Sequence, residues 1–104
     1  MFERMRLTAM IREKGLPQQT GAEVARRVVE GLAEIGLTLS GEVASVEGAL
    51  IAGPLPKPYG QDTIYCAAAM AGSNEQAAAA ALIAALTRPE TRETWEKAGF
   101  ELLG

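Results

Sequence analysis

The chain has 104 residues, a hydrophobic content of 48%, an aromatic content of 5% and a formal net charge of −3. A chain of this length can form one small domain with little margin for burying a core, and much of its apolar content is alanine. Its 10 basic residues form no stripe, and this argues against a nucleic-acid partner, because such binding needs clustered lysines and arginines to displace counterions.

The cysteine and histidine counts exclude several kinds of site. The only cysteine, Cys66, has no partner for an internal disulfide, and the chain has no histidine. Zinc sites built from cysteine and histidine are therefore excluded, and a catalytic thiol would lack an imidazole base.

No apolar run is long enough to span a membrane, and no apolar stretch after Met1 indicates a secretory signal. We expect no metal and no cofactor, and we interpret Cys66 as a small buried side chain.

Two helices are predicted in the first third of the chain. Apolar spacing indicates one helix over 2–14, which Gly15 ends. A second helix is predicted over 21–33, because Thr20 is a suitable N-cap and Glu23 follows it three residues later, which is the spacing of a capping box.

Strands and a stiff connector are predicted in the middle of the chain. Short apolar runs indicate strands at 35–40 and 49–52, and a longer buried strand at 62–70. The connector at 53–60 contains three prolines and two glycines, which favour an extended conformation. Alternation of helices and strands indicates an α/β protein.

The last third is predicted to be helical. Ser73 is expected to cap a helix over 74–86, and a second helix is expected over 89–98, ended by Gly99. Trp95 lies at helical spacing on this last segment, and we interpret it as a core residue.

Three stretches also carry a resemblance to a known family. They are Val28-Val29-Glu30-Gly31-Leu32-Ala33-Glu34-Ile35-Gly36-Leu37, then Gly53-Pro54-Leu55-Pro56, and finally a helix with Ala80-Ala81-Leu82-Ile83, followed by Leu86-Thr87-Arg88-Pro89-Glu90-Thr91-Arg92 and by Ala98-Gly99-Phe100-Glu101. In their order and spacing, they resemble the C-terminal half of molybdate-type periplasmic solute-binding proteins. The resemblance implies the type 2 periplasmic-binding-protein fold, in which two α/β lobes close on a ligand.

By this resemblance, the chain would supply part of that fold. Residues 1–60 would form part of the second, ligand-binding lobe, 61–72 a strand that crosses the hinge, and 73–104 the C-terminal helices of the first lobe. We therefore expect either a fragment of a longer protein, a truncated gene product, or a chain that pairs with copies of itself. Domain swapping of the C-terminal helices between protomers would provide the missing contacts.

The start of the second helix is the first candidate ligand site. Its first N–H groups lack partners within the helix, and the helix dipole places partial positive charge there. An oxyanion or carboxylate could be held by Thr20, Gly21 and Ala22, where the resembling family has a backbone contact to its ligand. The alternative for Thr20 is ordinary helix capping.

The second candidate is formed by Thr38, Leu39 and Ser40. In molybdate binders a tyrosine near this point donates to the oxyanion, and the matching residue here, Leu39, has no donor. Thr38 or Ser40 could replace it, and the alternative is a plain turn. This departure favours another anion or an organic acid over molybdate.

The combined prediction is a non-enzymatic, substrate-binding component of an ABC-type transporter, or a fragment of one. Its expected partners are a small anionic ligand, an ABC permease and further copies of the chain as a homo-oligomer. The resemblance implies a periplasmic location, whereas the lack of a signal peptide implies a cytoplasmic one if Met1 is the true start. One alternative is a small-acid isomerase on the same fold, although the chain shows no paired carboxylates to act as a base. Another is a self-associating protein without a ligand.

Overall fold

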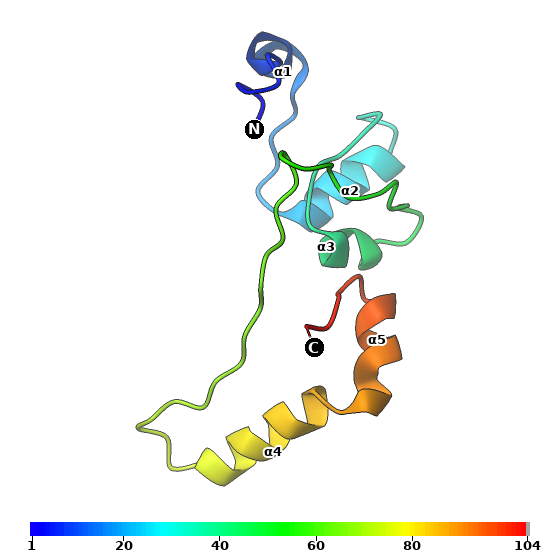
Figure 1. Cartoon of the computed structure of the whole chain (residues 1–104). Coiled ribbons are helices and arrows are strands. Elements are labelled where there is room, and N and C mark those ends of the chain that lie inside the picture. Colours follow the sequence, from blue (N-terminus) through cyan, green and yellow to red (C-terminus); the bar gives the residue numbers. More distant parts are fainter. Residues whose placement is uncertain (104) are drawn as a thin grey trace. The chain divides into compact units, whose positions relative to one another are not determined.

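The computed structural model describes residues 1–103, and all of their regular structure is helical. The elements are α1 (Thr8–Lys14), α2 (Gly21–Val29), α3 (Ser40–Ala44), α4 (Gln76–Leu86), a 3-10 turn η1 (Pro89–Thr91) and α5 (Arg92–Lys97) (Figure 1). They belong to two compact units, one over Met1–Gln61 and one that begins at Asp62.

The first predicted helix is shorter than expected. Met5 N–H donates to the Met1 carbonyl, which gives one helical turn, but Arg6 then adopts a left-handed conformation with φ of 59°. The predicted helix over 2–14 was therefore wrong in its first half, because this backbone reversal separates the first turn from α1. Its end was predicted correctly, since Gly15 is the C-cap of α1.

Helix α2 ends four residues before the predicted boundary. Gly31 has φ of 76° and donates to the Val28 carbonyl, while Leu32 N–H donates to the Arg27 carbonyl at 2.9 Å. These two bonds form a Schellman motif, which requires a left-handed residue at its turning point and so favours glycine there.

The segments predicted as strands at 35–40 and 49–52 form no strand. Instead, Ser40 begins α3, a short helix that the sequence analysis did not predict. A strand requires a neighbouring strand to accept and donate its backbone hydrogen bonds. Residues 1–103 provide no such neighbour, so these segments remain irregular.

The connection at 61–72 also forms no strand, and Figure 1 shows residues 62–70 as an extended trace without an arrow. No backbone hydrogen bond joins 62–69 to any other described residue. Cys66 is exposed, so the expectation that it is a buried core residue was wrong. The reason is the same as for the shorter segments, because no sheet covers this part of the chain within the described residues.

Helix α4 has an unusual composition for an exposed helix. Its eleven residues, QAAAAALIAAL, include no charge, and none of them is buried. Ser73 does accept a hydrogen bond, from Glu75 N–H at 3.0 Å, but α4 begins only at Gln76, so Ser73 is not its N-cap. Helices that are apolar on all sides normally lie inside a protein or against a partner.

The junction between α4 and α5 is fixed by one carbonyl group. The Leu86 carbonyl accepts from Trp95 Nε1 at 2.8 Å, and it shares the Thr91 hydroxyl proton, at 3.0 Å, with the Arg88 carbonyl, which is nearer at 2.7 Å. Gly99, with φ of 85°, ends α5, and Phe100 N–H donates back to the Trp95 carbonyl. The rings of Trp95 and Phe100 then pack edge to face, with centroids 5.5 Å apart. The predicted stop at Gly99 is confirmed, and Trp95 is half-buried rather than a full core residue.

The core is small, as the composition predicts. Among the apolar residues in 1–103 only Ala25 is buried, at 4% exposure, whereas Leu50 is 92% exposed and Met70 80%. The accessible surface of the chain is 8947 Å². Two separate compact proteins, each with half of the 11.0 kDa mass, would together expose only roughly 6,800 Å². The described residues therefore leave much apolar surface uncovered.

Candidate functional site

The start of α2 is closed by a full capping box. The Thr20 hydroxyl accepts from Glu23 N–H at 3.2 Å, while Glu23 Oε2 accepts from the N–H groups of Gln19 and Thr20 at 3.1 and 3.2 Å. The predicted capping box is confirmed. The Thr20 hydroxyl oxygen accepts from its own helix, which is the capping role, while its proton is donated to no other described residue.

A second carboxylate lies at the same helix start. Glu42 Oε1 accepts from Gly21 N–H at 3.3 Å, and Glu42 Oε2 accepts from the Thr38 hydroxyl at 2.9 Å. All three residues are half-buried. The structure thus brings together one residue from each of the two predicted site segments, and it does so around a carboxylate that the sequence analysis did not place there.

The other three predicted site residues, Ala22, Leu39 and Ser40, lie in the first turn of α2 and at the start of α3. Ala22 is half-buried in the first turn of α2, and its N–H donates to no other described residue. Leu39 is the N-cap of α3 and makes no side-chain cap, as expected for an apolar side chain. Ser40, the first residue of α3, is exposed.

Glu42 reaches this point because α3 exists. It is the third residue of α3, one helical turn beyond Thr38, so its side chain extends back over the start of that helix. The only sequence signal for this arrangement was the acidic residue itself, since carboxylates are favoured in the first turn of a helix. Because a strand was predicted at 35–40, no helix was expected to begin at Ser40, and Glu42 was not recognised as a residue of a first turn.

An apolar hollow of about 380 Å³ lies beside α2. Its lining combines α2 with residues from 36 to 50, and Thr38 is the one side chain in it that carries a hydroxyl. The residues are Val24, Ala25, Val28, Val29, Gly36, Thr38, Val43, Gly48, Ala49 and Leu50. The hollow can take apolar groups, with a hydrogen-bonding side chain at one point.

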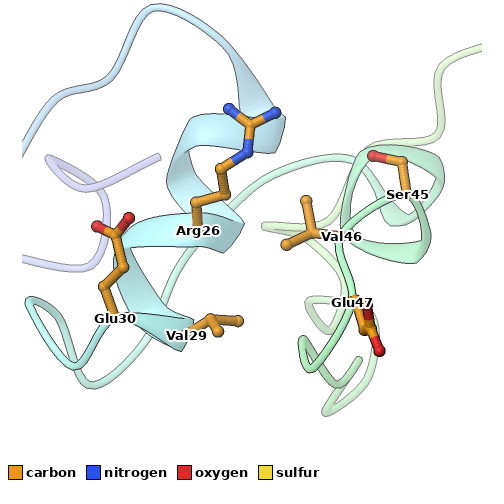
Figure 2. Close-up of a pocket in the computed structure, with 6 residues that line it drawn as sticks. All are labelled: Arg26, Val29, Glu30, Ser45, Val46 and Glu47. Carbon is orange, nitrogen blue, oxygen red and sulfur yellow. The ribbon is translucent and has the colours of Figure 1, made fainter.

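A second hollow, of about 280 Å³, lies between α2 and residues 45–47. Figure 2 shows Val29 and Val46 pointing into the space between these segments, with Arg26, Glu30 and Glu47 around them. Two carboxylates against one guanidinium make this hollow unsuitable for an anion, and neither predicted site segment lines it.

The described residues contain no group of three or more cysteine, aspartate or glutamate side chains arranged to hold a metal ion. Within the same residues, no helix has both the length and the apolar character needed to cross a membrane.

Comparisons with known proteins identify the family. A family model described as "Bacterial extracellular solute-binding protein" matches residues 1–101. Searches of curated proteins and of solved structures each return no match. Since the match spans nearly the whole chain, the protein belongs to the bacterial extracellular solute-binding protein family.

Proposed function

We propose that this chain binds a small anion, either an oxyanion or a small organic acid, on behalf of an ABC-type permease in the periplasm. Membership of the solute-binding family supports a binding role in transport rather than catalysis. The proposal that the ligand is an anion depends on one observation, which is that the Glu42 carboxylate accepts hydrogen bonds from Gly21 N–H and the Thr38 hydroxyl. A position that accommodates one carboxylate has the donors that a ligand carboxylate or oxyanion requires.

In this proposal the ligand contacts come from Thr20, Gly21 and Ala22 on one side and from Thr38, Leu39 and Ser40 on the other. Ala22 N–H supports the assignment, because it is a half-buried donor at the positive end of the α2 dipole. Thr38 contributes the hydroxyl that Leu39 lacks. The apolar hollow that Thr38 lines would suit the hydrocarbon part of an organic acid, whereas molybdate would leave it unfilled.

The proposal is tested by NMR titration of the isotope-labelled chain with citrate, sulfate and molybdate. The expected result is a saturable change in the amide resonances of Gly21 and Ala22 that exceeds the change at Gly72. Gly72 is a suitable control because it lies in the other unit, and a Cβ atom added there would meet open space. Saturable binding that leaves the Gly21 and Ala22 amides unchanged would contradict the assignment of this site.

We also propose that the full fold is an α/β, type 2 periplasmic-binding-protein-like arrangement, in which residues 61–72 pair with strands that these 103 residues do not provide. Two features support it. The segment 62–69 makes no backbone hydrogen bond to another described residue, and α4 is apolar on all sides yet uncovered. Backbone groups and apolar helices of this kind need partners to be stable in water.

Self-association without a ligand is a second candidate, and one observation favours it. Helix α4 carries no charge over eleven residues, and Leu82 on it is 60% exposed. Two copies that pair through α4, or exchange their C-terminal helices, would bury this surface.

This second candidate predicts that the molar mass measured by light scattering rises with concentration above the monomer value of 11.0 kDa. Replacing Leu82 by Glu should hold the mass at the monomer value, because a charge on the apolar face opposes burial. Thr94→Glu, which adds the same charge at an exposed position of α5, should still associate. A wild-type mass that stays constant over a hundredfold concentration range would contradict self-association.

A further inference from the structure

The carboxylate of Glu42 occupies the donors that the proposed ligand would use. We propose that Glu42 is an internal competitor for that ligand and determines which anions the start of α2 accepts. This inference rests on the proposed function, because it concerns the same position. It adds a residue outside the predicted site, whose effect is to exclude weakly held anions.

The geometry places the Glu42 carboxylate on the donors that the proposed ligand would need. Each Glu42 oxygen accepts from a different segment, Oε1 from Gly21 N–H at 3.3 Å and Oε2 from the Thr38 hydroxyl at 2.9 Å. A Cβ atom added at Gly21 would overlap both the Glu42 carboxylate and the Thr38 hydroxyl. The carboxylate therefore lies directly against the helix backbone, where a bound anion would lie.

The position of Glu42 in its own helix supports the same inference. A glutamate at the third position of a helix commonly bonds back to the N-cap N–H of that helix. Glu42 is at this position of α3, yet its oxygens accept from Gly21 of α2 and from Thr38, which precedes the N-cap Leu39. It therefore links two helices, and the link must open before another anion can take the donors.

The negative charge of Glu42 strengthens the competition. No described lysine or arginine forms an ion pair with Glu42, so its negative charge is not neutralised by a neighbouring cation. A displaced Glu42 would remain near the incoming anion, and like charges at short range repel. Anions, sulfate among them, should therefore bind more weakly while Glu42 is present than after its removal.

The test compares wild type with Glu42→Ala and Glu42→Gln, using sulfate as the probe. Glu47→Ala is the matched control, because Glu47 is an exposed carboxylate of the same unit with no contact to Gly21. Sulfate affinity is measured by NMR titration, and hydrogen exchange of the Gly21 amide is measured without ligand. Circular dichroism checks that each variant keeps its helices.

The expected result is that Glu42→Ala binds sulfate at least about tenfold more tightly than wild type and exchanges its Gly21 amide faster. Glu42→Gln should gain less, since its amide oxygen can still accept from Gly21 N–H while its charge is gone. Glu47→Ala should match wild type in both measurements.

Three outcomes would overturn the inference. Equal sulfate affinity in wild type and Glu42→Ala would overturn the competition and leave the proposed anion site intact. Unchanged Gly21 exchange in Glu42→Ala would show that the carboxylate does not hold that amide. Faster Gly21 exchange in Glu42→Ala with no sulfate binding by any variant would overturn the proposed anion site and the competition together.

Discussion

Replacing Ala25 by Asp is expected to unfold the first unit of the chain. Ala25 is its one buried apolar residue, at 4% exposure, and it lines a hollow in which Thr38 provides the one polar side chain. A carboxylate there would lose its hydration without gaining enough hydrogen-bond partners, at a cost of about 3 kcal/mol or more. Small domains have little stability beyond that amount. In a urea denaturation followed by circular dichroism, the helical signal that α2 contributes should already be missing before urea is added.

The control for this variant is Ala44→Asp. Ala44 is exposed at the end of α3, where an added negative charge opposes the helix dipole and costs only about 0.5 kcal/mol. An Ala25→Asp protein as stable as Ala44→Asp would mean that Ala25 is not at the core of the unit.

The second large effect is expected from replacing Trp95 by Ala, which should destabilise the second unit by about 2 kcal/mol. The indole makes an edge-to-face contact with Phe100, and its Nε1 donates to the Leu86 carbonyl at 2.8 Å. Both contacts join α5 to the segments on either side of it. The urea midpoint measured by circular dichroism should therefore fall, with a loss of helical signal from α4 and α5.

Trp95→Phe separates the two contributions. Phenylalanine keeps a ring against Phe100 but has no N–H group, so it should lose only about 1 kcal/mol. If both variants lose the same amount, the hydrogen bond to Leu86 would account for the whole effect and the ring contact for none of it.

Local signals in the sequence were sufficient for the helix boundaries that depend on neighbouring residues. The capping box of Thr20 and Glu23 and the stop at Gly99 depend on bonds within a few residues of each other, and both are present. The early end of α2 at Gly31 had a local signal too, since a glycine followed by an apolar residue fits a Schellman motif. The helix was nevertheless predicted to continue to residue 33, because apolar residues recur at helical spacing as far as Leu32.

Strands could not be predicted in the same way, because a strand depends on a neighbour elsewhere in the chain or beyond it. The segments 35–40 and 62–70 have the apolar composition of strands, but residues 1–103 do not pair them. The left-handed Arg6 also had no sequence signal, since arginine seldom adopts this conformation.

The candidate site was predictable only in part. The free donors at a helix start follow from the geometry of any helix, so Gly21 and Ala22 were foreseeable. That Glu42 would bond to Gly21, twenty-one residues away, was not, because it depends on α3 and on the path of the chain between the two helices. Thr38 was included for its hydroxyl, and the structure shows that this hydroxyl donates to Glu42.

The Leu86 carbonyl has a mechanical consequence. It accepts from Trp95 and shares the Thr91 hydroxyl with the Arg88 carbonyl, so it connects the end of α4 to η1 and α5. A molecule that binds α4 and changes its orientation would therefore also displace α5 and Phe100. A structural change in one of the two helices would be transmitted to the other.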